Sequence, residues 1–261
     1  MPSLLFLGTG ASVGIPVIGC SCNVCQSTNT KNQRLRTSTL LRIDGRSYLI
    51  DAGPDIRRQA LQHHINRIDG LILTHTHYDH VAGLEELRIY NFLQNGPIPC
   101  FLSEESLSEL KLLFHYIFKD KTNAKHKSNT SAFHFHVAPE AHGTFRLGEL
   151  TAHYCSYFQA GMQVLGLRFG SLAYITDIKN YSESIFSFLE GIETLVIGAI
   201  RFTQSPMHFT IDEAVEFSKK TTATHTYLVH LCHDVEHEHA ESLLPKGMHL
   251  AYDGLEIPFS L

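Results

Sequence analysis

Three histidines and one aspartate fall within six consecutive residues of the segment LILTHTHYDHVAGLEEL. They are His75, His77, Asp79 and His80, and they follow an apolar run that predicts a β-strand. Alternate side chains of an extended segment point the same way, so His75 and His77 share one face and can bind one cation. The turn after the strand brings Asp79 and His80 toward an adjacent position. The pattern favours ligands for two neighbouring metals over surface histidines, because these polar residues would otherwise interrupt a strand without a gain in packing.

Three cysteines, Cys20, Cys22 and Cys25, form a second cluster with metal-ligand spacing. Their thiolates are one ligand short of a closed tetrahedral zinc site. Reactive thiols and small buried hydrophobic residues are the alternatives, and the close spacing of the three cysteines argues against both. The remaining cysteines are isolated and are expected to be ordinary buried residues: Cys100, Cys155 and Cys232.

The composition predicts an ordinary globular protein. The chain has 261 residues, of which 43% are hydrophobic and 18% are charged. No apolar run approaches the roughly 18 residues that span a membrane, and the N-terminus lacks the basic and apolar regions of a signal peptide. A cytoplasmic location is therefore the default expectation, and disulfides are not expected there. With no internal repeat, low-complexity tract or Pro-rich linker, residues 1–261 are expected to form one domain.

The formal net charge of −5 argues against a protein built mainly to bind nucleic acid. Lysine and arginine nevertheless concentrate in KNQRLRT, residues 31–37, and continue at Arg42, Arg46, Arg57 and Arg58. A solvated face is the simpler interpretation of this cluster. The alternative is that one or two of these arginines contact a phosphate.

Residues 119–132, KDKTNAKHKSNTSA, are polar, basic and without periodicity. They predict a mobile surface loop. Such a loop could close over an anionic substrate as a lid, although a solvated loop is the simpler interpretation.

The elements that must position the metal-binding residues are predicted from local patterns. The pair Asp44-Gly45 between two apolar runs predicts a β-hairpin. A short helix is expected after Pro54, Ser103 is expected to cap another, and Thr210 with Glu213 forms a capping box. Strand-rich segments punctuated by helices in each half predict two sheets packed face to face with helices outside.

The motif THTHYDH after an apolar strand resembles the signature of the metallo-β-lactamase superfamily. Three further segments resemble the branch typified by phosphoribosyl 1,2-cyclic phosphate phosphodiesterase: LGTGASVGIPVIGCSCNVC, RLRTSTLLRIDGRSYLIDAGPD, and YLVHLCHD with the later LLPKGMHLAYDGLEI. The similarity extends from Leu4 to about Pro258, nearly the whole chain. It implies an α/β fold, the αβ/βα four-layer sandwich of this superfamily, and the activity of a metal-dependent hydrolase.

The resemblance also implies roles for individual residues at a binuclear metal centre. In chain order, the matching positions are His75 and His77 for a first metal, Asp79 and His80 for a second, Asp177 in YITD as the carboxylate that bridges both, and His230 in LVHLCH as the remaining ligand of the second.

Two further positions are carried over from the same resemblance. Asp51 in LIDAG matches a carboxylate that orients the histidine cluster without binding a metal itself. His233, three residues after His230, matches the fourth ligand at the three cysteines. The resemblance therefore implies a structural zinc that joins the N-terminal loop to the strand before His230.

One expected ligand is absent. In the family a His-Gly pair stands seven residues before the Gly of a Leu-Gly-x-Arg segment; here that segment is QAGMQVLGLR, and the position holds Gln159. Glutamine offers a neutral amide oxygen, a poor substitute for imidazole toward zinc. Three outcomes stay open for the first site: weak binding, a harder ion such as manganese, or no ion. His142, His153 and Cys155 lie nearby in sequence as replacement ligands, although nothing in the spacing requires them.

The activity implied by the resemblance is hydrolysis of a phosphodiester, with a small cyclic one as the leading expectation. Paired metals about 3.5–4 Å apart would hold a metal-bound hydroxide and lower its pKa, which places Asp79 among the catalytic residues. His208 in PMHFTIDEAV matches the position beside the leaving group and is expected to be the general acid. Its alternative is a surface histidine just before a helix cap. The expected cofactors are one or two zinc or manganese ions and a structural zinc.

Two other functions stay open. The superfamily shares one metal core among many substrates, so RNA processing or cyclic-nucleotide hydrolysis is the first; the negative net charge and the lack of a long RNA-binding arm count against transfer-RNA processing. The second is a phosphate-ligand binder that has lost hydrolysis because of Gln159, against which the retention of the other site residues argues. The expected partner is a small phosphorylated substrate, and a homodimer is expected from the resemblance alone.

Overall fold

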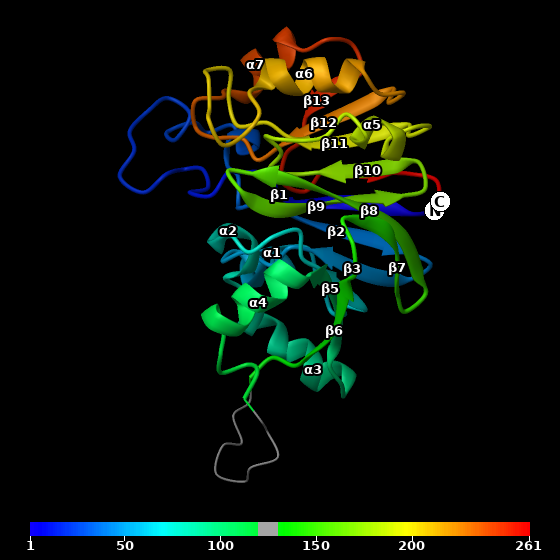
Figure 1. Cartoon of the computed structure of the whole chain (residues 1–261). Coiled ribbons are helices and arrows are strands. Elements are labelled where there is room, and N and C mark those ends of the chain that lie inside the picture. The colour runs from blue at the N-terminus through cyan, green and yellow to red at the C-terminus, as the bar shows by residue number, and fades with distance from the viewer. Residues whose placement is uncertain (120–129) are drawn as a thin grey trace.

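The structure is a computed structural model that describes residues 1–119 and 130–261. Two seven-stranded β-sheets pack face to face, and helices cover the outer face of each (Figure 1). The αβ/βα four-layer sandwich predicted from the sequence is therefore confirmed. The basic segment predicted as a surface loop and lid, 119–132, falls mainly on residues 120–129, which lie outside the described part of the chain.

The first sheet combines antiparallel and parallel strands. In sheet order they are β14 (Glu256–Pro258), β1 (Ser3–Gly8), β2 (Ser38–Ile43), β3 (Arg46–Ile50), β4 (Gly70–Ile72), β5 (Ile98–Ser103) and β6 (Phe133–Ala138). The strands from β14 to β3 pair antiparallel, and those from β3 to β6 pair parallel. The turn between β2 and β3 places Asp44 and Gly45 at φ angles of 49° and 75°, which confirms the predicted hairpin.

The second sheet has the same mixed character. In sheet order its strands are β13 (Met248–Leu250), β12 (His225–Val229), β11 (Thr194–Gly198), β10 (Leu172–Ile175), β9 (Met162–Phe169), β8 (Leu150–Gln159) and β7 (His142–Leu147). The strands from β10 to β13 pair parallel, whereas β7 to β10 pair antiparallel. Each sheet therefore has a set of parallel strands whose carboxyl ends meet at one edge, where polar residues can converge.

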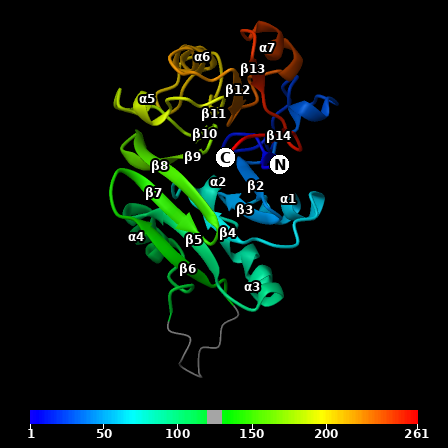
Figure 2. The same ribbon diagram turned by 90° about the vertical axis from the view of Figure 1, so that its right-hand side faces the viewer.

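Seven α-helices cover the two sheets within the described residues (Figure 2). On the first sheet lie α1 (Ile56–Gln62), α2 (Tyr78–Val81), α3 (Arg88–Gln94) and α4 (Glu104–Leu113); on the second lie α5 (Ile185–Phe188), α6 (Ile211–Lys219) and α7 (His237–Leu243). Short 3-10 helices cover Thr30–Asn32 and Leu84–Leu87. Ser103 caps α4 and Thr210 forms a capping box with Glu213 on α6, as predicted. In the described ranges, none of the helices has the length and apolar character needed to cross a bilayer.

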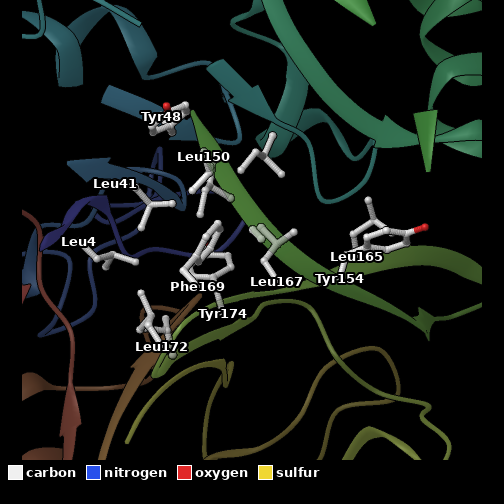
Figure 3. Packing of buried hydrophobic residues seen from close by; sticks show 14 of the residues in the cluster. Leu4, Leu41, Tyr48, Leu150, Tyr154, Leu165, Leu167, Phe169, Leu172 and Tyr174 are labelled. Atoms are coloured by element: carbon white, nitrogen blue, oxygen red, sulfur yellow. The ribbon is translucent and has the colours of Figure 1, made fainter. Parts of the chain in front are cut away.

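The core between the sheets follows from the period of two in the strands (Figure 3). Along β9, Leu165, Leu167 and Phe169 face this inter-sheet core, while Val164 faces the helices on the other side. Each of these four side chains has no exposed surface. Burial of such a side chain stabilises the fold by about 1.5–3 kcal/mol. The apolar faces of the two sheets therefore hold the sheets in the arrangement that places the polar residues at one edge.

The arginine cluster is only partly solvated. Arg34 is 1% exposed, and its guanidinium donates to Thr9 Oγ1 at 2.7 Å and to the carbonyl of Ala251 at 2.5 Å. Burial lowers the pKa of Arg34 to about 10. The prediction of a solvated face is therefore wrong for this residue, because Arg34 satisfies buried acceptors between the chain ends. The prediction of a solvated face holds for Arg42 and Arg46, whose side chains are 41% and 43% exposed.

Candidate metal centre

The polar residues singled out in the sequence gather at the carboxyl ends of parallel strands. Asp51 directly follows β3, and His75 comes three residues after β4 of the same sheet. Asp177 comes two residues after β10, and His230 directly follows β12. The two sheets face each other, so these four positions meet although they come from both halves of the chain.

The backbone is strained at three of these positions. Asp51, Asp177 and His230 have φ angles of 60°, 51° and 63°, in the left-handed region that favours glycine. None of the three is more than 2% exposed. Each such conformation costs on the order of 1–3 kcal/mol and tends to occur at functional sites. The sharp turn at each strand end directs the side chain into the gap between the sheets.

Four residues form the densest part of the centre: Asp79, His80, Asp177 and His230. His80 Nε2 lies 3.4 Å from Asp79 Oδ2 and 3.3 Å from Asp177 Oδ2. His230 Nε2 lies 3.3 Å from Asp79 Oδ2 and 3.2 Å from Asp177 Oδ1. All four side chains are almost fully buried. The structure thus brings together the residues that the sequence assigned to the second metal and to the bridge.

The donor set fits a divalent cation. His80 Nε2 is buried and has no hydrogen-bond partner among the described residues, although two carboxylates lie within 3.4 Å of it. Burial alone would lower the pKa of His80, but three nearby carboxylates, that of Asp177 first among them, raise it well above its ordinary value. Burial would raise the pKa of Asp79, yet His80 and His230 hold it well below its ordinary range. The negative charge of these carboxylates, which favours a proton on the His80 imidazole, would also favour a metal cation in the place of that proton.

Asp51 fixes the orientation of His80. Its Oδ2 lies 2.7 Å from His80 Nδ1 and accepts a hydrogen bond of 2.7 Å from Thr74 Oγ1, while Oδ1 accepts one of 2.8 Å from the Thr74 backbone N–H. A carboxylate at Nδ1 keeps the proton on that nitrogen and leaves Nε2 free to bind a cation. This is the orienting role that the sequence implied for Asp51.

His75 and His77 face each other at the outer side of the centre. His75 Nε2 and His77 Nδ1 lie 3.0 Å apart, so the two imidazoles point to a common position, as their alternation in an extended segment predicted. Burial and the positive charge of His80 hold the pKa of His75 well below its ordinary value. Burial also lowers the pKa of His77. Both imidazoles therefore favour the neutral form, which is the form that binds metal.

Gln159 occupies the position where a third ligand for this pair was expected. It is fully buried, and its Nε2 lies 3.3 Å from Asp177 Oδ1 and 3.0 Å from His208 Nδ1. Its Oε1 is buried and has no hydrogen-bond partner among the described residues. The first metal position therefore fits a cation less well than the second, with two imidazoles and a neutral amide.

The suggested replacement ligands lie elsewhere. His142 and Cys155 are paired across β7 and β8, and His153 Nδ1 lies 2.9 Å from Thr144 Oγ1 on the same two strands. Within the described ranges, neither histidine nor Cys155 belongs to any cluster with metal-ligand geometry. The idea that they compensate for Gln159 is not supported. Cys100, Cys155 and Cys232 are buried, as predicted.

His208 lies at the rim of the centre. Its Nδ1 is 3.2 Å from Asp177 Oδ1, its ring stacks on that of His230 with centroids 4.7 Å apart, and its side chain is 15% exposed. It thus reaches both the buried carboxylate and the solvent side. The alternative of an ordinary surface histidine is inconsistent with these contacts.

The three cysteines and His233 form a separate cluster. His233 Nδ1 lies 3.4 Å from Cys20 Sγ, 3.5 Å from Cys22 Sγ and 3.7 Å from Cys25 Sγ. Zinc bonds of about 2.3 Å to sulfur and 2.0 Å to nitrogen give a tetrahedron with edges of roughly 3.6 Å. The backbone N–H of Cys25 and the His233 ring lower the pKa of Cys22 to about 6, which favours the thiolate that binds metal. These four residues fit a closed zinc site.

Sequence reasoning missed several residues that support the centre. Thr74 donates to Asp51, and Thr176 Oγ1 donates to Asp177 Oδ2 at 2.7 Å. Thr74 and Thr176 each stand directly before a candidate ligand in the sequence. A hydroxyl residue next to a candidate ligand was therefore the signal that the sequence offered. Tyr157, whose OH donates to the Thr176 carbonyl, and Glu109, which accepts from Thr76, gave no such signal because they come from distant elements.

Comparison with known proteins places the chain in the β-lactamase superfamily. Residues 46–231 match the family model described as “Beta-lactamase superfamily domain”. “Octanoyltransferase” of Porphyromonas gingivalis is 32% identical over 256 residues, which are 97% of this chain and 50% of that protein. “Coenzyme PQQ synthesis protein B” of Rhodopseudomonas palustris is 30% identical over 126 residues, with 42% of this chain and 39% of that protein covered. The chain thus spans half or less of the length of these relatives.

Solved structures give the same assignment. A protein described as “a New Diphosphatase from the PhnP Family” is 34% identical, with a TM-score of 0.91 and coverage of 100% of this chain and 99% of that one. Zn(2+)-bound PqqB from Methylobacterium extorquens is 19% identical with a TM-score of 0.76, over 98% of this chain and all of that one. The short form of human tRNase Z is 17% identical with a TM-score of 0.70, over 99% of this chain and all of that one. The last two share the fold.

Proposed function

The chain belongs to the metallo-β-lactamase superfamily, in the branch that includes the PhnP family, and from this premise we propose that it hydrolyses phosphodiesters. Metal-dependent hydrolysis follows from the family itself. The finer proposal is a small cyclic phosphodiester as substrate. The observation that carries it is the position of His208, which joins the buried carboxylate of Asp177 to the open rim of the centre and so stands where a leaving group needs a proton.

We propose that Asp79, His80, Asp177 and His230 hold the catalytic cation. A divalent ion in such a site polarises a phosphoryl oxygen and lowers the pKa of water. Asp51 keeps the proton of His80 on Nδ1, so that Nε2 faces the site. The burial of these four side chains excludes water from most of the centre, which strengthens every charge interaction within it.

His208 supplies the proton for the leaving alkoxide in this proposal. Its Nδ1 lies 3.2 Å from Asp177 Oδ1, so that carboxylate can accept from Nδ1–H while Nε2 carries the proton for the leaving group. After the phosphorus–oxygen bond breaks, Nε2 donates that proton to the departing oxygen. The stacked ring of His230 restricts the rotation of His208 and keeps it beside the centre.

The structure of the diphosphatase in the PhnP family raises a second candidate, cleavage of a diphosphate. Both reactions break a phosphorus–oxygen bond, and they differ in the leaving group. A diphosphate releases a phosphate, which needs less help from an acid than an alkoxide does. The name octanoyltransferase belongs to a relative about twice as long as the matched part, so acyl transfer is not proposed for this chain.

The experiment is a comparison of substrates with the metal-loaded protein. Rates are measured with a five-membered cyclic phosphodiester, bis(p-nitrophenyl) phosphate, a sugar-linked diphosphate and a short RNA. The proposal expects the cyclic phosphodiester to give the highest kcat/KM, and Asp177→Asn to abolish that turnover. A preference for the diphosphate favours the second candidate, and turnover of RNA alone favours a processing enzyme. No turnover of any substrate would leave a phosphate-ligand binder.

We also propose zinc or manganese as the catalytic ion, a structural zinc at Cys20, Cys22, Cys25 and His233, and a homodimer acting on a small phosphorylated molecule. The cysteine cluster supports the structural zinc through its distances. Light scattering of the purified protein tests the dimer, and elemental mass spectrometry identifies the ions.

A further inference from the structure

We propose that the catalytic centre of this chain is built for a single divalent cation, and that Gln159 is a positioning residue that donates to Asp177 beside His208 instead of binding a second ion. The inference assumes a cation between Asp79, His80, Asp177 and His230, as in the proposed function, but it does not depend on the substrate. It concerns the one position where the chain departs from its family pattern.

The contacts of the Gln159 amide set its orientation. A carboxylate offers only acceptors, so the amide nitrogen, which carries two hydrogens, must face Asp177 Oδ1. The opposite assignment would place the amide oxygen against a carboxylate oxygen at 3.3 Å, which is repulsive. The same nitrogen lies 3.0 Å from each of the two ring nitrogens of His208. An amide nitrogen has no lone pair to offer a cation, so Gln159 presents donors on this side of the centre.

The hydrogen bond also uses the part of Asp177 that a second ion would need. Asp177 Oδ1 already lies 3.2 Å from both His208 Nδ1 and His230 Nε2, and the Gln159 nitrogen is a third neighbour at 3.3 Å. Its Oδ2 accepts from Thr176 and faces His80. Few directions remain from which this carboxylate could bridge a second cation.

The number of possible metal ligands differs between the first and the second metal position. Asp79, His80 and His230 form one cluster of possible ligands, and Asp177 adds a carboxylate 3.3 Å from His80 Nε2 and 3.2 Å from His230 Nε2. Among the described residues, no cluster of possible ligands contains both His75 and His77; His75 clusters only with His80 and Asp177, which also serve the second position. Catalytic zinc sites use three protein ligands as a rule. The first position falls short of that number and the second exceeds it.

The charges agree with this count. Two carboxylates, those of Asp79 and Asp177, face the centre directly, and Asp51 is engaged by hydrogen bonds with Thr74 and His80. One divalent cation balances two carboxylates, whereas two such cations would need further anions, such as hydroxide, to be balanced. Buried charge without a partner is costly, and Gln159 adds no negative charge that would balance a second ion.

The first test is the metal content per chain, measured by elemental mass spectrometry after reloading with zinc or with manganese. The native protein should hold about two ions, one at the centre and one at the cysteine cluster. Gln159→Ala should also hold about two, since no ligand is lost, and Gln159→His should hold about three. The matched control is Gln163→His, which adds an imidazole on the same hairpin but outside the centre, where Gln163 Nε2 donates to Ser156.

The opposite outcome is equally definite. About three ions in the native protein would overturn the single-ion centre, and a fall to about two in Gln159→Ala would show that the Gln159 oxygen is itself a ligand. Asp79→Asn identifies the catalytic ion, because it should lose that ion and retain the one at the cysteines. These counts are independent of turnover, so they stand even if the proposed substrate is wrong.

The positioning role has its own readout. Gln159 contacts Asp177 and His208 rather than solvent, so Gln159→Ala should lower kcat about tenfold or more while KM changes little, the loss expected for a hydrogen bond to a charged group. Gln159→Asn, whose shorter amide cannot reach Asp177, should give a similar loss. An unchanged kcat in both variants would refute this role, and a rise in KM alone would point to substrate contact.

Discussion

Asp51 illustrates at the residue scale how a buried carboxylate can orient a candidate metal ligand. It is fully buried, strained at a φ of 60°, and uses both carboxylate oxygens on Thr74 and His80. Among the described residues, His80 Nδ1 has no other hydrogen-bond partner than Asp51. Such orienting carboxylates hold the imidazole in the right tautomer and increase its basicity.

Asp51→Asn should therefore weaken binding of the catalytic ion by about 10–100-fold. An amide can face His80 with its oxygen, but it carries no charge and cannot accept equally well from Thr74. The measurement is a competition titration of the metal against a chelator of known affinity. Asp44→Asn is the control, because Asp44 sits in an exposed left-handed turn that asparagine adopts readily. Equal affinity in the two variants would contradict the role of Asp51.

His208→Gln should lower kcat by about 10²–10⁴-fold with an alkoxide leaving group while the metal content stays the same. The reason is that His208 donates a proton and is not among the four residues proposed to hold the ion. With p-nitrophenolate, which leaves without a proton, the loss should be much smaller. The measurement is a pair of kcat values for the two leaving groups. An equal loss with both would show that His208 does not act as the acid.

At the scale of elements, the centre depends on how strand ends are joined to the N-terminal loop. The backbone of Ala11 donates to the carbonyl of Leu231 at 3.0 Å, and Leu231 donates to that of Thr9 at 3.0 Å. Leu231 directly follows His230, and His233 lies two residues further on. The cysteine cluster therefore joins the loop to the same segment that carries the candidate ligand His230.

Cys22→Ser should remove one ion per chain and lower the melting temperature by roughly 5–10 °C, because a closed zinc site contributes directly to folding. Differential scanning calorimetry and elemental analysis of the same sample measure both. Ser21→Ala, next to the cluster and exposed, should change neither. A melting temperature that stays the same while zinc is lost would mean that the cluster does not stabilise the fold.

At the scale of the whole molecule, Arg34 joins three distant parts of the chain. Its guanidinium contacts Thr9, the carbonyl of Ala251 and His237 Nδ1, the last at 3.0 Å. Asp253 accepts from Thr9 and from the backbone of Leu35, and burial raises the pKa of Asp253 to about 6. This buried network closes the molecule where its first and last strands meet.

The pH dependence of stability should reflect His237. Burial and the charge of Arg34 lower the pKa of His237 to about 4, whereas unfolding returns it to about 6.5. Its contribution is therefore fully present above pH 6.5 and is lost as the pH falls toward 4, because only the unfolded chain takes up the proton. The other charges near it, those of Lys31, Glu238 and Glu241, have smaller effects.

When the pH falls from 7 to 4, the free energy of unfolding should decrease in both proteins. The decrease should be larger for the native protein than for His237→Gln, by on the order of 2 kcal/mol. Urea unfolding at both pH values measures the difference. Asp253 acts in the opposite sense, since its raised pKa favours the folded state as the pH falls from 6, but it is common to both proteins and cancels. Parallel stability curves for the two proteins would exclude His237 as the source.

The sequence by itself determined what depends on neighbours along the chain. The ligands at His75 to His80, the three cysteines, the Asp44-Gly45 hairpin and the Thr210 capping box were all predicted from local spacing, because turns, caps and chelate pairs are short-range. The family pattern added Asp177, His208, His230 and His233, and the structure brings them to their expected neighbours. The fold followed from the same pattern.

Only the tertiary structure decided the rest, since it depends on contacts between distant segments. Asp79 meets His230 across 151 positions of sequence, and Cys20 meets His233 across 213. Spacing along the sequence could not show that Gln159 faces Asp177 and His208. Nor could it show that Arg34 is buried rather than solvated. Whether a polar side chain finds a buried partner is set by which strands become neighbours, and the packing of two sheets fixes that only after the whole chain has folded.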